Sequence, residues 1–140
     1  MIPRSGNIHL TAEQMNILDE QAKSAWPIEA CAILIGRTNK ETVIINEVYL
    51  VANSDKSSIS FKISAQDTIR AYDRADELES EVVGVFHSHP APPFPSSTDL
   101  QFMRQNPVVW VIMSMPSGVV KAHRLTDNNA EEIGIRVTSN

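Results

Sequence analysis

The chain has 140 residues, of which 42% are hydrophobic, and a formal net charge of -5 at pH 7. Its length predicts one domain, residues 1–140, that can bury about two-thirds of its unfolded surface. The negative charge argues against a sequence-independent hold on nucleic acid. No apolar run approaches the ~18 residues of a membrane span, and the N-terminus lacks the apolar segment of a signal peptide, so we expect a cytoplasmic protein.

Apolar periodicity and turn residues predict alternating strands and helices. A short strand near Asn7–Leu10 precedes a helix that begins after Thr11, with Gln14 completing a capping box, and that stops at Pro27. The elements expected next are strands near Ala30–Gly36, Thr42–Val51 and Ile59–Ile63, a helix near Ala65–Leu78 capped by Ser64, a strand over Glu81–Pro90, a short helix over Ser96–Arg104, strands near Val108–Met113 and Val119–Leu125, and a last short strand or helix from Ala130.

The apolar stripe of the second long helix predicts that Ile69, Tyr72, Ala75 and Leu78 face inward. The order of elements predicts an α/β fold, a single compact domain with a mixed β-sheet flanked by helices.

Two histidines, His87 and His89, close the apolar strand that begins at Glu81. Residues at i and i+2 of a strand project from the same face, roughly 7 Å apart along the backbone. Both imidazoles can therefore converge on one ion, and zinc binds imidazole nitrogen at about 2.0–2.1 Å. Asp99 is the candidate third ligand, and three protein ligands leave the open position that is typical of a catalytic zinc. The spacing predicts one Zn²⁺ per chain.

Each of these residues also has a purely structural interpretation. A single histidine in an apolar strand is usually a packed core residue, but a pair at i and i+2 with a small residue between them favours the metal. Ser96-x-x-Asp99 is equally typical of a helix capping box, in which Ser96 is the N-cap and Asp99 the third helical residue. Capping and ligation are compatible, because a capped helix holds the carboxylate in a fixed place.

Cys31 is the only cysteine, which excludes an intramolecular disulfide and favours a reducing compartment. We expect Cys31 to be a core residue that shares a strand face with Glu29, near the site. His9 and His123 have no acid or histidine at ligand spacing, so we expect them to be surface or packing residues.

Three segments together resemble the JAMM (MPN-plus) zinc metallopeptidases: Pro27-Ile-Glu29-Ala-Cys-Ala-Ile-Leu-Ile-Gly36, His87-Ser-His-Pro90, and Pro95-Ser96-x-x-Asp99. The resemblance runs from the first helix to about residue 125. It implies a JAMM/MPN-like fold, related to the cytidine deaminase-like architecture, with zinc bound by His87, His89 and Asp99, Glu29 as general base and Ser96 as donor to the oxyanion. It also implies cleavage after the C-terminal glycines of ubiquitin, ubiquitin-like or sulfur-carrier proteins, and the short connections resemble the minimal, stand-alone prokaryotic members.

The loop between the second and third ligands departs from that family. Pro90 to Thr98 is nine residues, where ten are usual, and we expect the shortening within Pro90–Pro95; a deletion after the serine would put Ser97 in place of Ser96. Four of the chain's eight prolines lie in Pro90–Pro95, so the loop should be stiff.

The expected chemistry is hydrolysis by a zinc-activated water. Zinc lowers the pKa of its water from about 16 to about 7 and polarises the scissile carbonyl. Glu29 would take the proton, and Ser96 would stabilise the developing negative charge. Two alternatives stay open: a metal-free MPN-like protein-interaction module, and a zinc hydrolase of small peptide amides. The expected partner is a ubiquitin-like or sulfur-carrier protein, and no membrane or oligomeric state is predicted.

Overall fold

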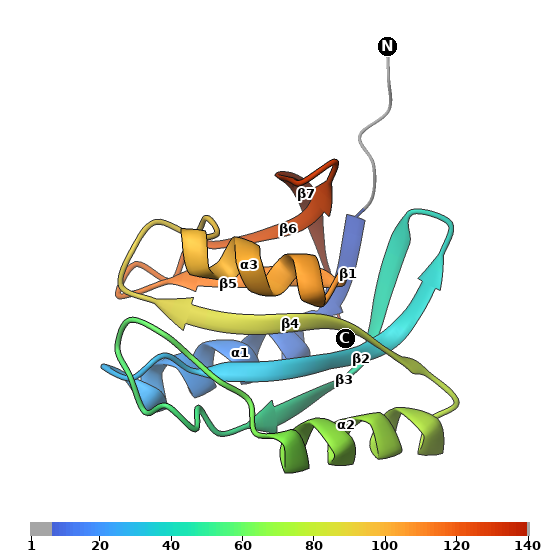
Figure 1. Cartoon of the computed structure of the whole chain (residues 1–140). Helices are drawn as coiled ribbons and strands as arrows, with labels where there is room; N and C mark the ends of the chain where they lie inside the picture. Colours follow the sequence, from blue (N-terminus) through green and yellow to red (C-terminus); the bar gives the residue numbers. More distant parts are fainter. Residues whose placement is uncertain (1–6, 140) are drawn as a thin grey trace.

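The computed structural model describes residues 7–139, in which seven strands and three helices follow one another (Figure 1). Residues 1–6, on which the expectation about a signal peptide rests, and Asn140 lie outside the described residues. None of the helices in the described part is long and apolar enough to span a bilayer. The strands are β1 (Asn7–Thr11), β2 (Cys31–Asn39), β3 (Thr42–Val51), β4 (Glu81–His89), β5 (Val109–Ser114), β6 (Val120–Thr126) and β7 (Asn129–Thr138), and the helices are α1 (Ala12–Ala25), α2 (Ala65–Glu77) and α3 (Ser97–Gln105).

All seven strands join one mixed sheet that closes on itself, in the order β1-β3-β2-β4-β5-β6-β7. β1 is parallel to both β3 and β7, and β4 is parallel to β5, whereas the other neighbours are antiparallel. The predicted α/β fold with a mixed sheet is confirmed, but its closure was not predicted. Closure depends on the tail from Ala130, which belongs to a strand of 10 residues and pairs with β1 as well as β6. The relation to the cytidine deaminase-like architecture stays a prediction.

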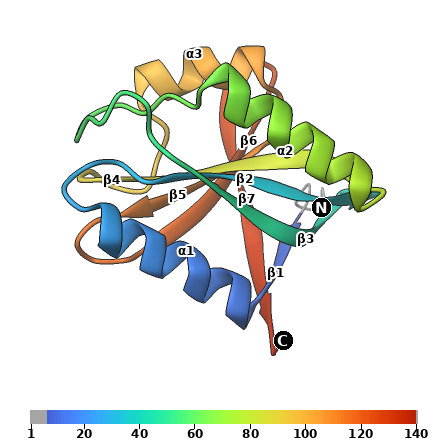
Figure 2. The ribbon, with the colours of Figure 1, turned by 90° about the horizontal axis from the view of Figure 1, so that it is seen from below.

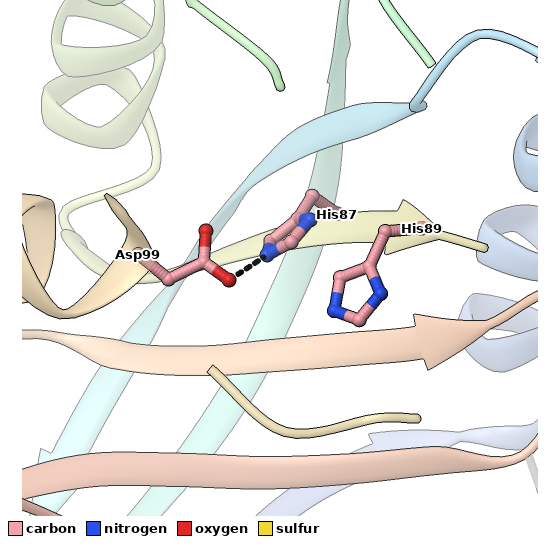
Figure 3. A group of neighbouring side chains, drawn as sticks. All are labelled: His87, His89 and Asp99. Atoms are coloured by element: carbon pink, nitrogen blue, oxygen red, sulfur yellow. Dashed lines mark ion pairs between the residues drawn. The ribbon is translucent and has the colours of Figure 1, made fainter. Parts of the chain in front are cut away.

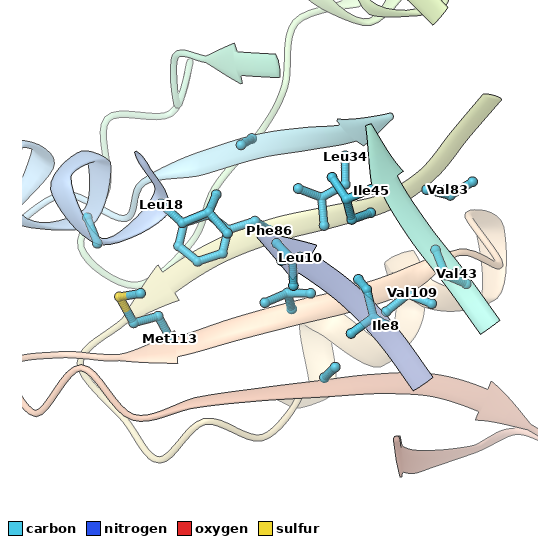
Figure 4. Packing of buried hydrophobic residues seen from close by; sticks show 14 of the residues in the cluster. Ile8, Leu10, Leu18, Leu34, Val43, Ile45, Val83, Phe86, Val109 and Met113 are labelled. Carbon is cyan, nitrogen blue, oxygen red and sulfur yellow. The ribbon is translucent and has the colours of Figure 1, made fainter. Parts of the chain in front are cut away.

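The central strands β2 and β4 are buried on both faces, with α1 on one side and α2 and α3 on the other (Figure 2). Leu34 and Phe86 pack with Leu18 of α1 in the larger core cluster, part of which is drawn in Figure 4. Ile33 points the other way and packs in a second cluster with Ala71 of α2. Burial on both faces explains why the sequence of β2 is a continuous apolar run without alternation.

The helix starts follow the sequence prediction closely. The Thr11 hydroxyl oxygen accepts a hydrogen bond from the Gln14 backbone N–H at 3.0 Å, and the Gln14 side-chain oxygen accepts one from the Thr11 N–H at 2.9 Å. These two bonds form the expected capping box at α1. Ser64 caps α2 by accepting from the Asp67 N–H at 3.1 Å. The local polar residues therefore fix where both helices begin.

The predicted strand over Ile59–Ile63 is wrong, because residues 52–64 form an irregular loop. The buried side chain of Asn53 takes the place of a neighbouring strand. Its amide nitrogen donates to the Ser60 carbonyl at 2.9 Å, and its oxygen accepts from the Lys62 N–H at 3.1 Å. Side-chain bonds of this kind offer the backbone an alternative to a sheet ladder.

The predicted inner face of α2 is partly wrong. Ile69 and Tyr72 are 62% and 54% exposed, whereas Ala71 and Ala75 are buried and Leu78 packs against the core. Small residues at i and i+4 let the helix lie close to the sheet. The helix is therefore rotated from the predicted orientation, which leaves two large apolar side chains on the surface.

Candidate metal centre

The three predicted ligands meet where β4 ends and α3 begins. His87, His89 and Asp99 each offer one ligand atom, and these atoms all lie within 4.8 Å of one another. Figure 3 shows the two imidazoles on β4 and the carboxylate approaching His87 from α3. The three residues are only 1%, 7% and 5% exposed, respectively. The described residues thus form a buried group that could hold a metal ion.

The capping box of α3 fixes the position of Asp99. The Ser96 N–H donates to Asp99 Oδ2 at 2.9 Å, and the Asp99 N–H donates to the Ser96 hydroxyl oxygen at 3.1 Å. The same Oδ2 atom lies 3.3 Å from Nε2 of His87. The predicted cap is therefore confirmed, and it directs the carboxylate toward the histidines.

Aromatic rings hold the His87 imidazole on both sides. Phe61 stacks on it with ring centroids 4.6 Å apart, and Trp110 meets it edge-on at 5.9 Å. Nδ1 of His87 lies 3.3 Å from Oε1 of Glu29, so the ring stands between two carboxylates. Its orientation is thus fixed by packing as well as by charge.

A metal ion would satisfy ring nitrogens that the described residues leave without hydrogen-bond partners. None of the four ring nitrogens of His87 and His89 has a hydrogen-bond partner, although all four are buried. The approaches of the carboxylates to His87 are ion-pair contacts. Buried polar atoms without partners are costly and rare in proteins. Two imidazoles and one carboxylate are also a ligand set that zinc accepts, so the residues fit this metal.

The protonation of the two histidines differs because their neighbours differ. Burial opposes a charge on His87, but Asp99 and Glu29 outweigh it and raise the pKa of His87 to about 9. Burial lowers the pKa of His89, and the positive charge of His87 lowers it further. Burial alone would raise the pKa of Asp99, yet its pairing with His87 and its bonds from Ser96 hold that pKa below the usual value. The two carboxylates therefore attract one positive charge into this site, a place that a metal cation suits.

Glu29 lies beside the ligand group without belonging to it. It is buried just before β2, and its N–H donates to the Ser57 carbonyl at 2.8 Å. The neighbouring residues tie this segment to β4, because the Ala30 N–H donates to the hydroxyl of Ser88 at 2.9 Å and the Ser88 N–H donates to the Ala30 carbonyl at 3.1 Å. The residue between the two histidines therefore sets the position of Glu29 relative to them.

A cleft of about 550 Å³ opens over the group and is reached by Glu29, Ser96 and Asp99. Its walls come mainly from the 52–64 loop, the proline-rich loop and α3. The lining residues are Glu29, Ile59, Ser60, Phe61, His89, Pro90, Ala91, Pro92, Phe94, Ser96, Thr98, Asp99 and Phe102. A second cleft of about 420 Å³ shares Phe61 and Phe102 with it. The site is thus open to a substrate on one side and packed against the barrel on the other.

Cys31 is a packed core residue, as expected. It is paired with His87 across β2 and β4, and burial, followed by the charges of Asp67 and Glu29, raises the pKa of its thiol to about 12. His123, expected at the surface or in packing, is buried in β6.

Sequence reasoning did not find the supporting residues Asn53, Phe61 and Trp110. The amide nitrogen of Asn53 also donates to the Glu29 carbonyl, at 3.0 Å, so one side chain joins the loop to the candidate base. Phe61 fell in a segment predicted to be a strand, and Trp110 in an apolar run, where an aromatic residue signals only burial. The one available signal was Asn53, a polar residue two positions after the end of β3, and such a residue is typical of a turn.

The comparisons with known proteins agree with this geometry. Residues 11–126 match the family described as prokaryotic homologs of the JAB domain. A desampylase from Pyrococcus furiosus is 35% identical over 107 residues, which cover 76% of this chain and 73% of that protein. The solution structure of protein DSY2949 from Desulfitobacterium hafniense superposes with a TM-score of 0.85 at 28% identity, over 95% of this chain and 94% of that one.

A crystal structure of a JAB1/MPN domain protein from Archaeoglobus fulgidus has the same fold, with a TM-score of 0.61 at 22% identity over 94% of this chain and 98% of that one. The family match covers all three helices and strands β2 to β6, and it ends before β7. The chain therefore belongs to the prokaryotic branch of the JAB (JAMM/MPN) domain family.

Proposed function

We propose that this protein is a zinc-dependent hydrolase of JAMM type, which cleaves a peptide or isopeptide bond after the C-terminal tail of a ubiquitin-like protein. The observation that carries this proposal is the buried His87, His89 and Asp99 group, whose imidazole nitrogens lack hydrogen-bond partners, with a separate carboxylate from Glu29 in the same cleft. Similarity to a protein named desampylase supports the hydrolytic activity and the substrate class.

The proposal assigns one task to each residue type. A zinc ion held by His87, His89 and Asp99 would supply Lewis acidity and lower the pKa of an attacking water. Glu29 takes the proton of that water and passes it to the leaving amine as the C–N bond breaks. The hydroxyl of Ser96 accepts a bond from the Asp99 N–H and keeps its own hydrogen, which it can donate to the carbonyl oxygen of the substrate.

The lining of the cleft favours a substrate bond within a conjugate or fusion over a bond next to the free carboxylate of a short peptide. Among the described residues that line it there is no lysine or arginine, and its ionisable groups are the acids Glu29 and Asp99 together with His89. The cleft therefore offers no basic side chain to pair with the free carboxylate of a short peptide. This argues for a conjugate or fusion as substrate, and we place the reaction in the cytoplasm because the one thiol is free and buried.

The test uses the purified protein, its metal content, and two kinds of substrate. We expect about one zinc per chain, as for a site with three protein ligands. Linear fusions and lysine conjugates of a ubiquitin-like protein ending in Gly-Gly should be cleaved, whereas short peptide amides should not. Cleavage of the peptides alone would favour a small-amide hydrolase, and a protein that takes up no zinc would favour an interaction module. Cleavage that survives complete removal of zinc would contradict the proposal.

A further inference from the structure

The loop between the second and third ligands is fastened to the barrel at its middle. His123 lies on β6, is only 2% exposed, and places its Nε2 atom 2.8 Å from the carbonyl oxygen of Pro93. Because a carbonyl oxygen can only accept, Nε2 carries the hydrogen. The ring of Phe94 packs beside the same imidazole, with centroids 5.7 Å apart. A buried side chain outside the ligand group thus holds this loop.

We propose that His123 is a positioning residue for the metal site, acting through the Pro90–Pro95 loop. This inference rests on the proposed zinc function. The loop leaves His89 and enters the cap of Asp99, so a shift of the loop moves both ligands relative to His87. Proline fixes φ at four of the six loop positions, so the loop is stiff. Holding a stiff loop at Pro93 therefore restrains both of its ends, one at His89 and the other at the cap of Asp99.

The same bond also shapes the cleft. Pro93 is buried against the barrel, whereas Pro90, Ala91, Pro92 and Phe94 line the cleft around it. Phe94 is half exposed and presents one side of its ring toward His123. Fastening Pro93 therefore sets the wall of the cleft as well as the spacing of the ligands.

The experiment compares three replacements of His123 in the full chain. The amide nitrogen of glutamine reaches about as far from the backbone as Nε2 of histidine, whereas that of asparagine stops short, and leucine has no donor. We expect H123L and H123N to weaken zinc binding by about tenfold, the lower range found for residues that orient metal ligands. H123Q should bind zinc within about twofold of the unaltered protein, since it keeps the donor.

Zinc affinity is measured by competition with a chelator, and the absorption spectrum of the Co²⁺-loaded protein reports ligand geometry independently of turnover. Ile133→Val, a core change on β7 in the larger core cluster, controls for lost packing. A cobalt spectrum shifted in H123L and restored in H123Q would support the inference. Equal zinc affinity in all variants, or equal loss in H123Q and H123L, would overturn it. An unaltered protein that binds no zinc would overturn the proposed function and this inference together.

Discussion

Two helices of this protein begin with the same local motif, and only one of them belongs to the site. At α1 the capping residues are Thr11 and Gln14, and the Gln14 amide also donates to the Ile45 carbonyl at 3.1 Å. At α3 they are Ser96 and Asp99, and the carboxylate lies 3.3 Å from His87. The first box ties a helix to β3, whereas the second presents an acid to two histidines. A motif that fixes a helix start can therefore position a functional group at no extra structural cost.

The largest effect should come from Asp99→Asn, which separates the two tasks of this residue. The amide oxygen can still accept from the Ser96 N–H, so the cap persists, but the anionic ligand is gone. We expect zinc affinity to fall on the order of 100-fold or more, and cleavage to fall with it. Gln14→Ala at the matching position of α1 should leave zinc binding unchanged. Chelator competition measures both, and an Asp99→Asn protein that binds zinc like the parent would mean that the α3 box is only a cap.

The next effect concerns Glu29, which lies outside the capping boxes of α1 and α3. Glu29→Gln keeps the hydrogen bonds of its backbone but cannot accept a proton. We expect zinc content to stay near that of the parent while the rate of cleavage falls by about 10²- to 10⁴-fold, the usual contribution of a general base. Elemental analysis and a cleavage assay measure the two quantities. Unchanged turnover would remove Glu29 from the mechanism.

Ser96→Ala and Thr11→Ala compare the two N-caps directly. Each should lower the free energy of unfolding by about 1 kcal/mol, because each leaves a helix N–H without its side-chain partner. Ser96→Ala should in addition lower kcat by roughly 10²-fold, since the donor to the oxyanion is lost. Thr11→Ala should leave kcat unaltered. Equal kcat values in the two variants would make Ser96 a cap alone, and would reopen the case for Ser97.

The last effect is a pH dependence that only the α3 side should show. The pKa of His87 is raised to about 9 in the metal-free fold, above its ordinary value of about 6.5. Its contribution to stability is thus fully present below pH 6.5 and is lost as the pH rises through about 9. Metal-free protein should therefore unfold at lower urea concentration at pH 9 than at pH 6, and zinc should remove this difference by replacing the proton. Thr11→Ala should keep the slope, whereas Asp99→Asn should flatten it.

Much of the candidate site could be predicted because its chemistry is local in sequence. The spacing of His87 and His89 needs only strand geometry, and the box at Ser96 needs only a helix start. What joins them is not local. The Asn53 side chain supplies hydrogen bonds to the backbone of the loop that a neighbouring strand would otherwise supply. Ile59–Ile63 therefore has the composition of a strand but does not pair with one.

The orientation of α2 and the closure of the sheet were missed for a related reason. Ile69 and Tyr72 have the periodicity of a buried face, but close packing on the sheet favours Ala71 and Ala75, a choice that depends on the distance between layers. One of the two partners of β7 is β1, the strand farthest from it in sequence, and no local pattern indicates such a pairing.

The position of β1 between β3 and β7 bears on how the protein is made. Of the seven described strands, β1 is synthesised first and its neighbour β7 last, more than a hundred residues later. Until then the nascent chain carries unpaired edges on β1 and β6, which are surfaces that favour association with other chains. We expect a chain released before Asn129 to aggregate, even though it already contains Glu29 and all three candidate ligands.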